Sequence, residues 1–252
     1  MSAYRDEMVI STKAGYDMWE GPYGNWGSRK YLIASLDQSL KRMGLPYVDI
    51  FYHHRMDPNT PLEETMEALA QIVRSGKALY VGLSNYDGPT MAKAERILDE
   101  LHCPFIINQN CYSILDRTVE KNGLLKQTYA SGRGLICFSP LAQGMLTDKY
   151  LQNIPKDSRV ARDGRFLHED QVVSMRPLLT ALNDIAAGYN MSLSELAIAW
   201  LLNKPEVTTV LIGASKPEQI LSNLKAAEKQ RTTEMEAEEL ALIEKAVNLY
   251  HA

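Results

Sequence analysis

The stretch ALYVGLSN, residues 78–85, is a short apolar run that ends in two small polar residues. Five other stretches have the same form, and a helix-like segment follows each of them. These are Val9–Lys13, Val48–Arg55 (VDIFYHHR), Phe105–Asn110 (FIINQN), Leu135–Pro140 (LICFSP) and Val207–Ser215 (VTTVLIGAS). Continuous apolar runs are typical of strands buried on both faces, as in parallel sheets. Their recurrence, at intervals of about 30 residues, predicts a series of βαβ units.

Polar residues collect where each predicted strand ends, which is typical of the active face of a (β/α) barrel. We therefore predict an α/β fold of the TIM (β/α)8-type, built as one domain over residues 1–252. Six of the eight strands that such a barrel needs are recognisable. An incomplete barrel of this kind leaves its first and last strands with unpaired edges.

Composition excludes several classes of protein. Apolar residues make up 45% of the chain and the net charge is −4, which argues against disorder and against general nucleic-acid binding. No apolar run approaches the roughly 20 residues that cross a bilayer, and the opening residues do not resemble a signal peptide. The three cysteines show no metal-binding spacing, so we expect free thiols, no metal site and a cytoplasmic location.

Helix boundaries are marked by capping residues. Ser28 is predicted to cap a helix that ends before Gly44. Capping boxes are predicted at Thr60–Glu63, Ser192–Glu195 and Ser215–Glu218.

Charged and titratable residues at the first two strand ends are candidates for catalysis. Lys13 ends the first run, where it is either a catalytic or Schiff-base lysine or an edge lysine that reaches solvent. His53 and His54 end the second run, and neighbouring strand residues point to opposite faces. One of the two histidines should therefore face the barrel interior, and either one could instead be a structural core histidine.

Amides and small residues follow the later strands. Ser84–Asn85 and Gln109 could hold a carboxamide, although asparagine also ends strands for ordinary turn reasons. The loop after Ser139 contains Gly144, which allows close approach of the backbone to a phosphate. Ser215–Lys216 opens a helix, where backbone amides suit an anion; a plain helix cap is compatible with this role.

Two long insertions follow predicted strands, at residues 15–27 and 150–174. The first is rich in aromatic residues, so Tyr16, Trp19 and Trp26 could form walls around a small substrate, or could simply pack the loop. Arg55 and Arg29 could bind a phosphorylated substrate, or could form ordinary ion pairs at the surface.

Taken together, five motifs resemble those of the aldo-keto reductases over nearly the whole chain. They are ISTKAGYDMW (10–19), YVDIFYHHRMDPNTPLEET (47–65), SGKALYVGLSN (75–85), FSPLAQGMLTDKY (138–150) and VLIGASKPEQILSN (210–223). Within that family the chain is most similar to the bacterial glyceraldehyde-3-phosphate reductase group, near the potassium-channel β subunits. The resemblance implies NADPH-dependent reduction of a small aldehyde or ketone.

The resemblance also implies roles for individual residues. Lys13 and His54 match the catalytic lysine and histidine, and Arg55, Tyr16, Trp19 and Trp26 lie where the substrate would bind. The cofactor residues that it implies are Ser84, Asn85, Gln109, Tyr112, Ser139, Leu141, Gln143, Gly144, Leu146, Ser215, Lys216, Gln219 and Asn223.

The resemblance begins at about Tyr4, whereas members of the family begin with two further strands that carry a catalytic aspartate and tyrosine. We therefore expect impaired turnover. Three explanations of the missing strands are open: the chain is a fragment of a longer protein, it is a truncated product that rearranges its edge strands, or its edge strands pair with a second copy in a homo-oligomer. We expect His54 to have a pKa near neutrality, which makes it a candidate to replace the missing tyrosine as the acid. The alternative functions are a catalytically weak NADP(H)-binding regulatory subunit and a lyase that uses Lys13 as a Schiff base.

Overall fold

The computed structural model describes residues 2–156, 158–162, 165, 167–232 and 235–251. The chain divides into two compact units. Unit 1 comprises Met1–Asn110 and Val119–Leu135, and unit 2 comprises Cys111–Thr118 and Ile136–Ala252. Each unit is described by itself below.

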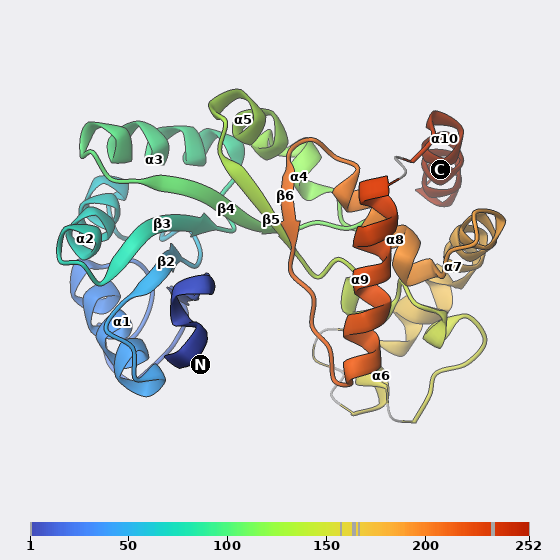
Figure 1. The fold of residues 1–252 in the computed structure, drawn as a ribbon, viewed down its shortest axis with the longest axis horizontal. Helices are drawn as coiled ribbons and strands as arrows, with labels where there is room; N and C mark the ends of the chain where they lie inside the picture. Colours follow the sequence, from blue (N-terminus) through green and yellow to red (C-terminus); the bar gives the residue numbers. More distant parts are fainter. Residues whose placement is uncertain (1, 157, 163–164, 166, 233–234, 252) are drawn as a thin grey trace. The chain divides into compact units, whose positions relative to one another are not determined.

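The six predicted strands are confirmed, and each is followed by helices (Figure 1). They are parallel and follow one another in the order β1-β2-β3-β4-β5-β6, so that β1 and β6 end the series. The strands are β1 (Ser11–Ala14), β2 (Val48–His53), β3 (Ala78–Ser84), β4 (Phe105–Cys111), β5 (Gly134–Phe138) and β6 (Val207–Val210).

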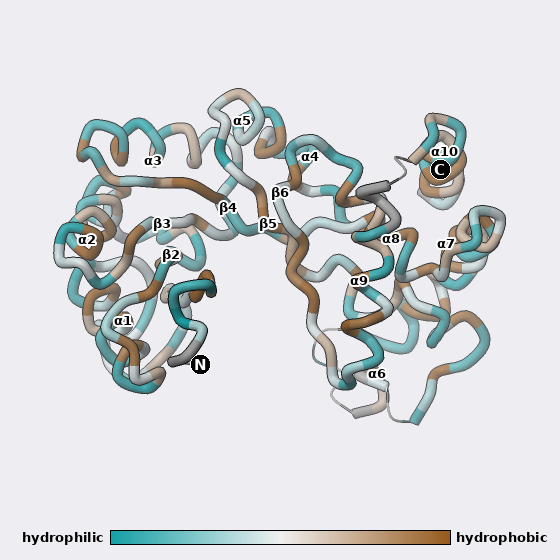
Figure 2. The backbone as a smooth tube through the Cα atoms, in the orientation of Figure 1, coloured by the Kyte–Doolittle hydropathy of each residue, from teal (hydrophilic) through white to brown (hydrophobic). Residues whose placement is uncertain are grey.

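Helices α1 (Arg29–Met43), α2 (Leu62–Arg74) and α3 (Gly88–Glu100) of unit 1 lie along the outer side of β2, β3 and β4 (Figure 1). The apolar residues of α1 recur at i and i+4, and Leu32 and Leu36 are fully buried. The first part of β4, Phe105–Ile107, is strongly hydrophobic, as expected for a strand covered on both faces (Figure 2). Shorter elements complete this part: η1 (Ser2–Glu7), α4 (Thr118–Lys121) and α5 (Leu124–Ser131).

The ends of α1 form as predicted, and the start of α2 does not. Ser28 accepts a hydrogen bond from the backbone N–H of Tyr31 at 3.4 Å, and Gly44 adopts a left-handed φ of 66°. The predicted capping box at Thr60–Glu63 is wrong, because no side chain caps α2. Asp57 instead accepts from the amides of Asn59 and Thr60, and so holds the turn before the helix.

Unit 2 is mainly helical. Helix α8 (Leu193–Leu202) contacts both α7 (Glu169–Gly188) and α9 (Pro217–Thr232), and α10 (Ala237–His251) packs on α7. The predicted capping box at Ser192–Glu195 is confirmed by reciprocal bonds of 3.2 and 2.8 Å. Short helices lie in the connections: η2 (Ala142–Gly144), η3 (Asp148–Tyr150) and α6 (Arg159–Arg162).

Among the described residues, no single helix has the length and apolar composition of a membrane span. Helices α7 and α8 meet that test only as a pair, which is bent by 81°.

Candidate functional site

Lys13 lies at the end of β1, where its Cα pairs with that of Tyr52 in β2. Its side chain is half-buried, and its ammonium donates a hydrogen bond to Oε1 of Gln109. Burial lowers the pKa of Lys13, because desolvation disfavours the charged form. The side chain is therefore directed into unit 1 and does not extend freely to solvent.

His54 follows β2 directly, and its backbone N–H donates to the carbonyl of Ala14 at 2.8 Å. The imidazole meets the ring of Tyr16 edge-on, with the centroids 4.6 Å apart. Burial, followed by the positive charges of Lys13 and Arg55, lowers the pKa of His54 to about 4. The expected near-neutral pKa is thus wrong, because burial and, to a lesser extent, two cations oppose protonation, and His54 is neutral at pH 7.

His53 points away from this group, as the alternation of strand residues predicts. It is fully buried, and its Nδ1 lies 2.7 Å from the hydroxyl of Tyr86. Burial lowers the pKa of His53 to about 4. His53 is therefore the structural histidine of the pair, and His54 is the candidate for chemistry.

The amide residues predicted at the ends of β3 and β4 lie beside Lys13 and His54. Asn85 has a left-handed φ of 56°, which asparagine tolerates better than most residues. The Nδ2 of Asn85 donates to the backbone carbonyl of His54 at 2.9 Å. The backbone N–H of Asn85 donates to the backbone carbonyl of Gln109 at 3.0 Å. Ser84 is fully buried, and its hydroxyl accepts from Asn85 at 3.3 Å.

Arg55 is held between two aromatic rings of the loop at residues 15–27. The centre of its guanidinium lies 3.7 Å from the centroid of Trp26 and 4.0 Å from that of Tyr16. Nε donates to the carbonyl of Gly15 at 2.7 Å, and Nη2 donates to Oδ1 of Asn25 at 2.9 Å. Tyr16 contacts both Arg55 and His54, so it links the arginine to the candidate catalytic residues.

Trp19 packs the aromatic loop. Its ring lies 5.3 Å from that of Tyr31 in α1, with a tilt of 42°. The Tyr31 hydroxyl donates to the carbonyl of Tyr16 at 2.6 Å and accepts from the amide of Gly15 at 3.1 Å. The sequence analysis missed this role of Tyr31, because a tyrosine on the apolar stripe of a helix looks like a simple core residue.

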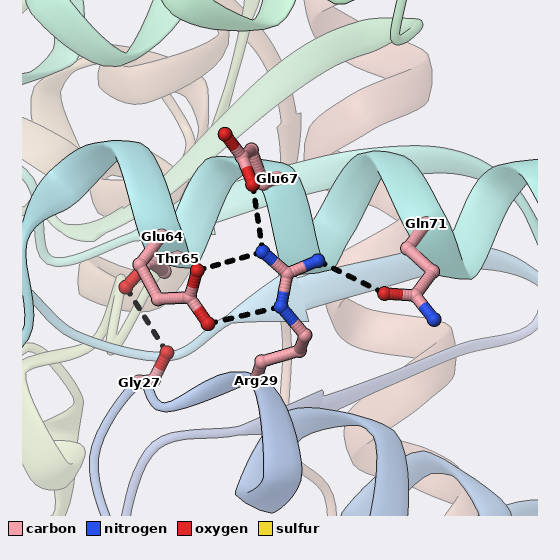
Figure 3. A network of polar contacts seen from close by, with 6 residues as sticks. All are labelled: Gly27, Arg29, Glu64, Thr65, Glu67 and Gln71. Carbon is pink, nitrogen blue, oxygen red and sulfur yellow. Dashed lines mark hydrogen bonds and ion pairs between the residues drawn. The ribbon is translucent and has the colours of Figure 1, made fainter.

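Arg29 belongs to an ion-pair network between α1 and α2 (Figure 3). Nε and Nη2 bind both carboxylate oxygens of Glu64, at 2.9 and 2.6 Å, and Nη2 also binds Glu67 at 2.7 Å. Nη1 donates to Gln71 at 3.0 Å. The structure therefore decides between the two alternatives for Arg29 in favour of the ion pair.

A cavity of about 1130 Å³ lies within unit 2. Four segments line it: the loop after β5, the loop after β6, the first turns of α9 and Ser194 at the start of α8. The predicted residues on its wall are Ser139, Leu141, Gln143, Gly144, Ser215, Gln219 and Asn223. Leu146, Lys216 and Tyr112 do not line it; Leu146 is fully buried and Lys216 is exposed.

The loop after β5 has an unusual backbone. Ser139, Ala142 and Gln143 have φ values of 55°, 45° and 60°, and Gly144 has 96°. Such conformations are costly for residues other than glycine and concentrate at functional sites. Hydrogen bonds from Ala142 N to Ser139 O (2.9 Å) and from Gly144 N to Leu141 O (2.8 Å) hold the loop in this form.

The side chain of Gln219 folds back onto the loop before α9. Its Oε1 accepts from the backbone N–H of Ser215 at 2.8 Å, from the Ser215 hydroxyl at 3.2 Å and from the Lys216 amide at 3.3 Å. The predicted Ser215–Glu218 capping box is therefore replaced by a cap from Gln219. An acceptor oxygen already occupies the place where these donors would meet an anion.

Tyr112 is fully buried in unit 2, and its ring meets Trp200 edge-on at 5.3 Å. The predicted stacking of Tyr112 on a cofactor ring stays a prediction. Several residues of the cavity wall were missed by the sequence analysis, because no motif singles them out: Lys149, Tyr150, Ser194, Leu211 and Ser222.

The matching family model is that of the aldo/keto reductase family, and it covers residues 1–246. The chain belongs to the aldo/keto reductase family. Members of this family are oxidoreductases that use NAD(P)H and act on small carbonyl compounds. They fold as (β/α)8 barrels, and six parallel strands that alternate with helices are consistent with an incomplete barrel.

Three similar proteins each match most of this chain. The chain is 51% identical to an L-glyceraldehyde 3-phosphate reductase of Escherichia coli O157:H7, over 98% of its own length and 71% of the relative. It is 54% identical to the protein of that name from Escherichia coli K12, over 89% of its length and 66% of the relative. A probable voltage-gated potassium channel subunit beta of Oryza sativa subsp. japonica is 36% identical, over 88% of this chain and 69% of the relative.

Proposed function

We propose that this chain reduces the carbonyl group of a small aldehyde or ketone to an alcohol, with NADPH as the hydride donor. The observation that carries this proposal is the convergence of Lys13, His54 and Gln109 in unit 1. Carboxyl ends of parallel strands are where barrel enzymes place their chemistry. The names of two relatives make L-glyceraldehyde 3-phosphate the first substrate to test.

The donors at the carboxyl ends of the strands suit a carbonyl oxygen. The neutral His54 ring can donate one N–H, and the Lys13 ammonium supplies a second donor together with a positive charge. Both would stabilise the negative charge that develops on the oxygen as hydride reaches the carbon. The lowered pKa of Lys13 makes its ammonium a better proton donor to that oxygen than an exposed lysine would be.

The residues of unit 2 fit the anionic part of NADPH. The backbone amides of Ser215 and Lys216 both donate hydrogen bonds to one oxygen, Oε1 of Gln219. A phosphate oxygen is an acceptor of the same kind, and Lys216 adds positive charge beside it. Ser215 and Asn223 would hold the phosphate of the adenosine, and Ser139, Leu141, Gln143 and Gly144 would hold the pyrophosphate.

The test is NADPH consumption with glyceraldehyde, methylglyoxal and L-glyceraldehyde 3-phosphate. Lys13→Met and His54→Gln should each lower the rate by roughly 100-fold or more, because each removes a donor to the carbonyl oxygen. Lys77→Met is the matched control, since Lys77 is exposed and paired with Asp37. Equal rates in Lys13→Met and Lys77→Met would contradict the proposal.

The alternative functions give different results in the same experiments. NADPH that binds, as seen by nicotinamide fluorescence, without being consumed by any of the aldehydes would support a regulatory subunit. The names of the potassium-channel relatives favour this alternative. A borohydride-trapped adduct on Lys13 would support the lyase instead.

A further inference from the structure

We propose that Arg55 binds the phosphate group of an aldehyde substrate, and so selects phosphorylated over unphosphorylated aldehydes. This inference rests on the proposed function, whose reaction site it extends. It is argued from the charge, the packing and the remaining donors of Arg55, all of which lie within unit 1.

Among the residues that the structure describes, the guanidinium of Arg55 lacks a neutralising partner. In the part of the chain that the structure describes, no ion pair joins it to a carboxylate. Both oxygens of the nearby Asp57 are engaged by backbone amides, Oδ2 with Gly27 at 2.8 Å and Oδ1 with Asn59 at 2.8 Å. Arg29, at the start of α1 in unit 1, is satisfied by Glu64 and Glu67. Of these two candidate arginines, Arg55 is the one that retains its charge for a ligand.

The guanidinium is held in place before any ligand arrives. Its centre lies over the rings of Tyr16 and Trp26, and Gly15 and Asn25 accept hydrogen bonds from Nε and Nη2. Stacked arginines of this kind bind phosphate with little loss of side-chain entropy, because the planar fork is already oriented. Nη1 donates to none of the described residues, and it is not among the fully buried polar atoms that lack a partner. Its two N–H groups are therefore available to a phosphate.

The position of Arg55 suits a small bifunctional substrate. The ring centroid of Tyr16 lies 4.0 Å from the centre of the Arg55 guanidinium and 4.6 Å from the centroid of the His54 ring. The Tyr16 side of this cluster is open, since 46% of that residue is exposed. An aldehyde whose carbonyl lies at His54 and Lys13 would thus place an anionic group a few bonds away near Arg55. Two cations favour an anionic substrate there over a neutral one.

The binding test uses glycerol 3-phosphate, which carries the phosphate and has no carbonyl group to reduce. Calorimetric titration should show binding to the wild-type chain and roughly 10- to 100-fold weaker binding to Arg55→Gln, because a charged hydrogen-bonding partner is lost. Arg55→Lys should be intermediate, since it keeps the charge and loses the fork. Arg29→Gln should bind as the wild type does.

The kinetic test separates a substrate contact from a purely structural role. Arg55→Gln and Arg55→Lys should raise the KM for glyceraldehyde 3-phosphate by a factor roughly tenfold larger than any rise in the KM for glyceraldehyde, because only the first substrate carries the phosphate. Inorganic phosphate should inhibit reduction of glyceraldehyde competitively in the wild type, and less in Arg55→Lys. The inhibition of the wild type does not depend on whether a variant folds.

The outcomes distinguish this inference from the proposed function. Equal increases of KM for both aldehydes, or unchanged glycerol 3-phosphate binding in Arg55→Gln, would overturn the role of Arg55. Wild-type reduction of glyceraldehyde without any effect of phosphate would overturn it as well, and would leave the reductase standing. Glycerol 3-phosphate binding that depends on Arg55, in a chain that consumes no NADPH, would support the anion site and reject the reductase.

Discussion

Nζ of Lys13, at the end of β1, donates a hydrogen bond to Oε1 of Gln109 in β4. These residues are 96 positions apart in the chain, and β2 and β3 lie between them in the sheet. An amide oxygen satisfies the half-buried ammonium without neutralising it. Burial therefore still lowers the pKa of Lys13, which a carboxylate partner would raise.

Substitution of Gln109 should tune the reactivity of Lys13. Gln109→Glu should raise the pKa of Lys13 and slow its acetylation by acetic anhydride, because the neutral amine is the reactive form. Gln109→Leu should lower the pKa further and accelerate acetylation, and it should cost about 1–3 kcal/mol of stability through the lost acceptor. Mass spectrometry of Lys13-containing peptides measures the rate. The same rate in all three proteins would show that Gln109 is not the controlling partner.

Acidification should destabilise unit 1 through His53. Its pKa is about 4 in the folded chain and near 6.5 when unfolded, so between these values the unfolded chain binds more protons. The free energy of unfolding should thus rise with pH from about 4 to 6.5, and His53 should contribute up to about 3 kcal/mol of that rise. Urea denaturation at pH 5 and pH 7 measures the difference.

His53→Asn is expected to reduce this pH dependence, whatever its effect on stability at pH 7. His102→Asn serves as the matched control, because His102 is exposed. A pH dependence that survives His53→Asn unchanged would assign the effect to other groups, of which His54 is the first to examine.

Gly27→Ala should destabilise the chain by about 1–3 kcal/mol through overpacking. An added Cβ would lie 2.8 Å from Nε2 of His53 and 3.0 Å from Oγ1 of Thr65. His53 cannot move aside easily, since it is buried and bonded to Tyr86. Thermal or urea denaturation measures the loss. In Gly188→Ala the new methyl group meets open space, and a cost as large as that of Gly27→Ala would refute the packing argument.

The ion pair between Arg29 and Glu64 should stabilise the packing of α1 on α2 by a modest amount. A double-mutant cycle of Arg29→Gln and Glu64→Gln should give a coupling of about 0.5–1 kcal/mol, which falls at high salt because both groups are partly exposed. The bidentate geometry places the expected coupling energy at the upper end of the range for ion pairs at protein surfaces. A coupling of zero at low salt would mean that solvent fully screens the pair.

Lys216 should contribute to the preference for NADPH over NADH. Lys216→Met should weaken NADPH binding by roughly tenfold and leave NADH binding unchanged, because only NADPH carries the additional phosphate. Fluorescence titration with both dinucleotides measures this. Lys225→Met removes an exposed lysine within α9, the helix that begins directly after Lys216, and should change neither affinity. Equal weakening by both variants would point to general electrostatic attraction at α9.

Local sequence pattern determined much of the architecture. Continuous apolar runs such as ALYVGLSN predicted the strands, since a strand buried on both faces must be apolar throughout. Ser28 and Gly44 marked the ends of α1, because capping depends on residues a few positions apart. Lys13 and Gln109 could be expected near one another, since parallel strands bring their carboxyl ends to the same edge.

The partners of long polar side chains were decided by tertiary structure. Arg29 and Arg55 were equivalent candidates in the sequence, yet Arg29 pairs with two glutamates of α2 and Arg55 stacks between Tyr16 and Trp26. Hydrophobic periodicity reports which face of an element is buried. It carries no information on which distant carboxylate or aromatic ring will lie within 4 Å of a guanidinium, because that distance is set only when separate elements pack together.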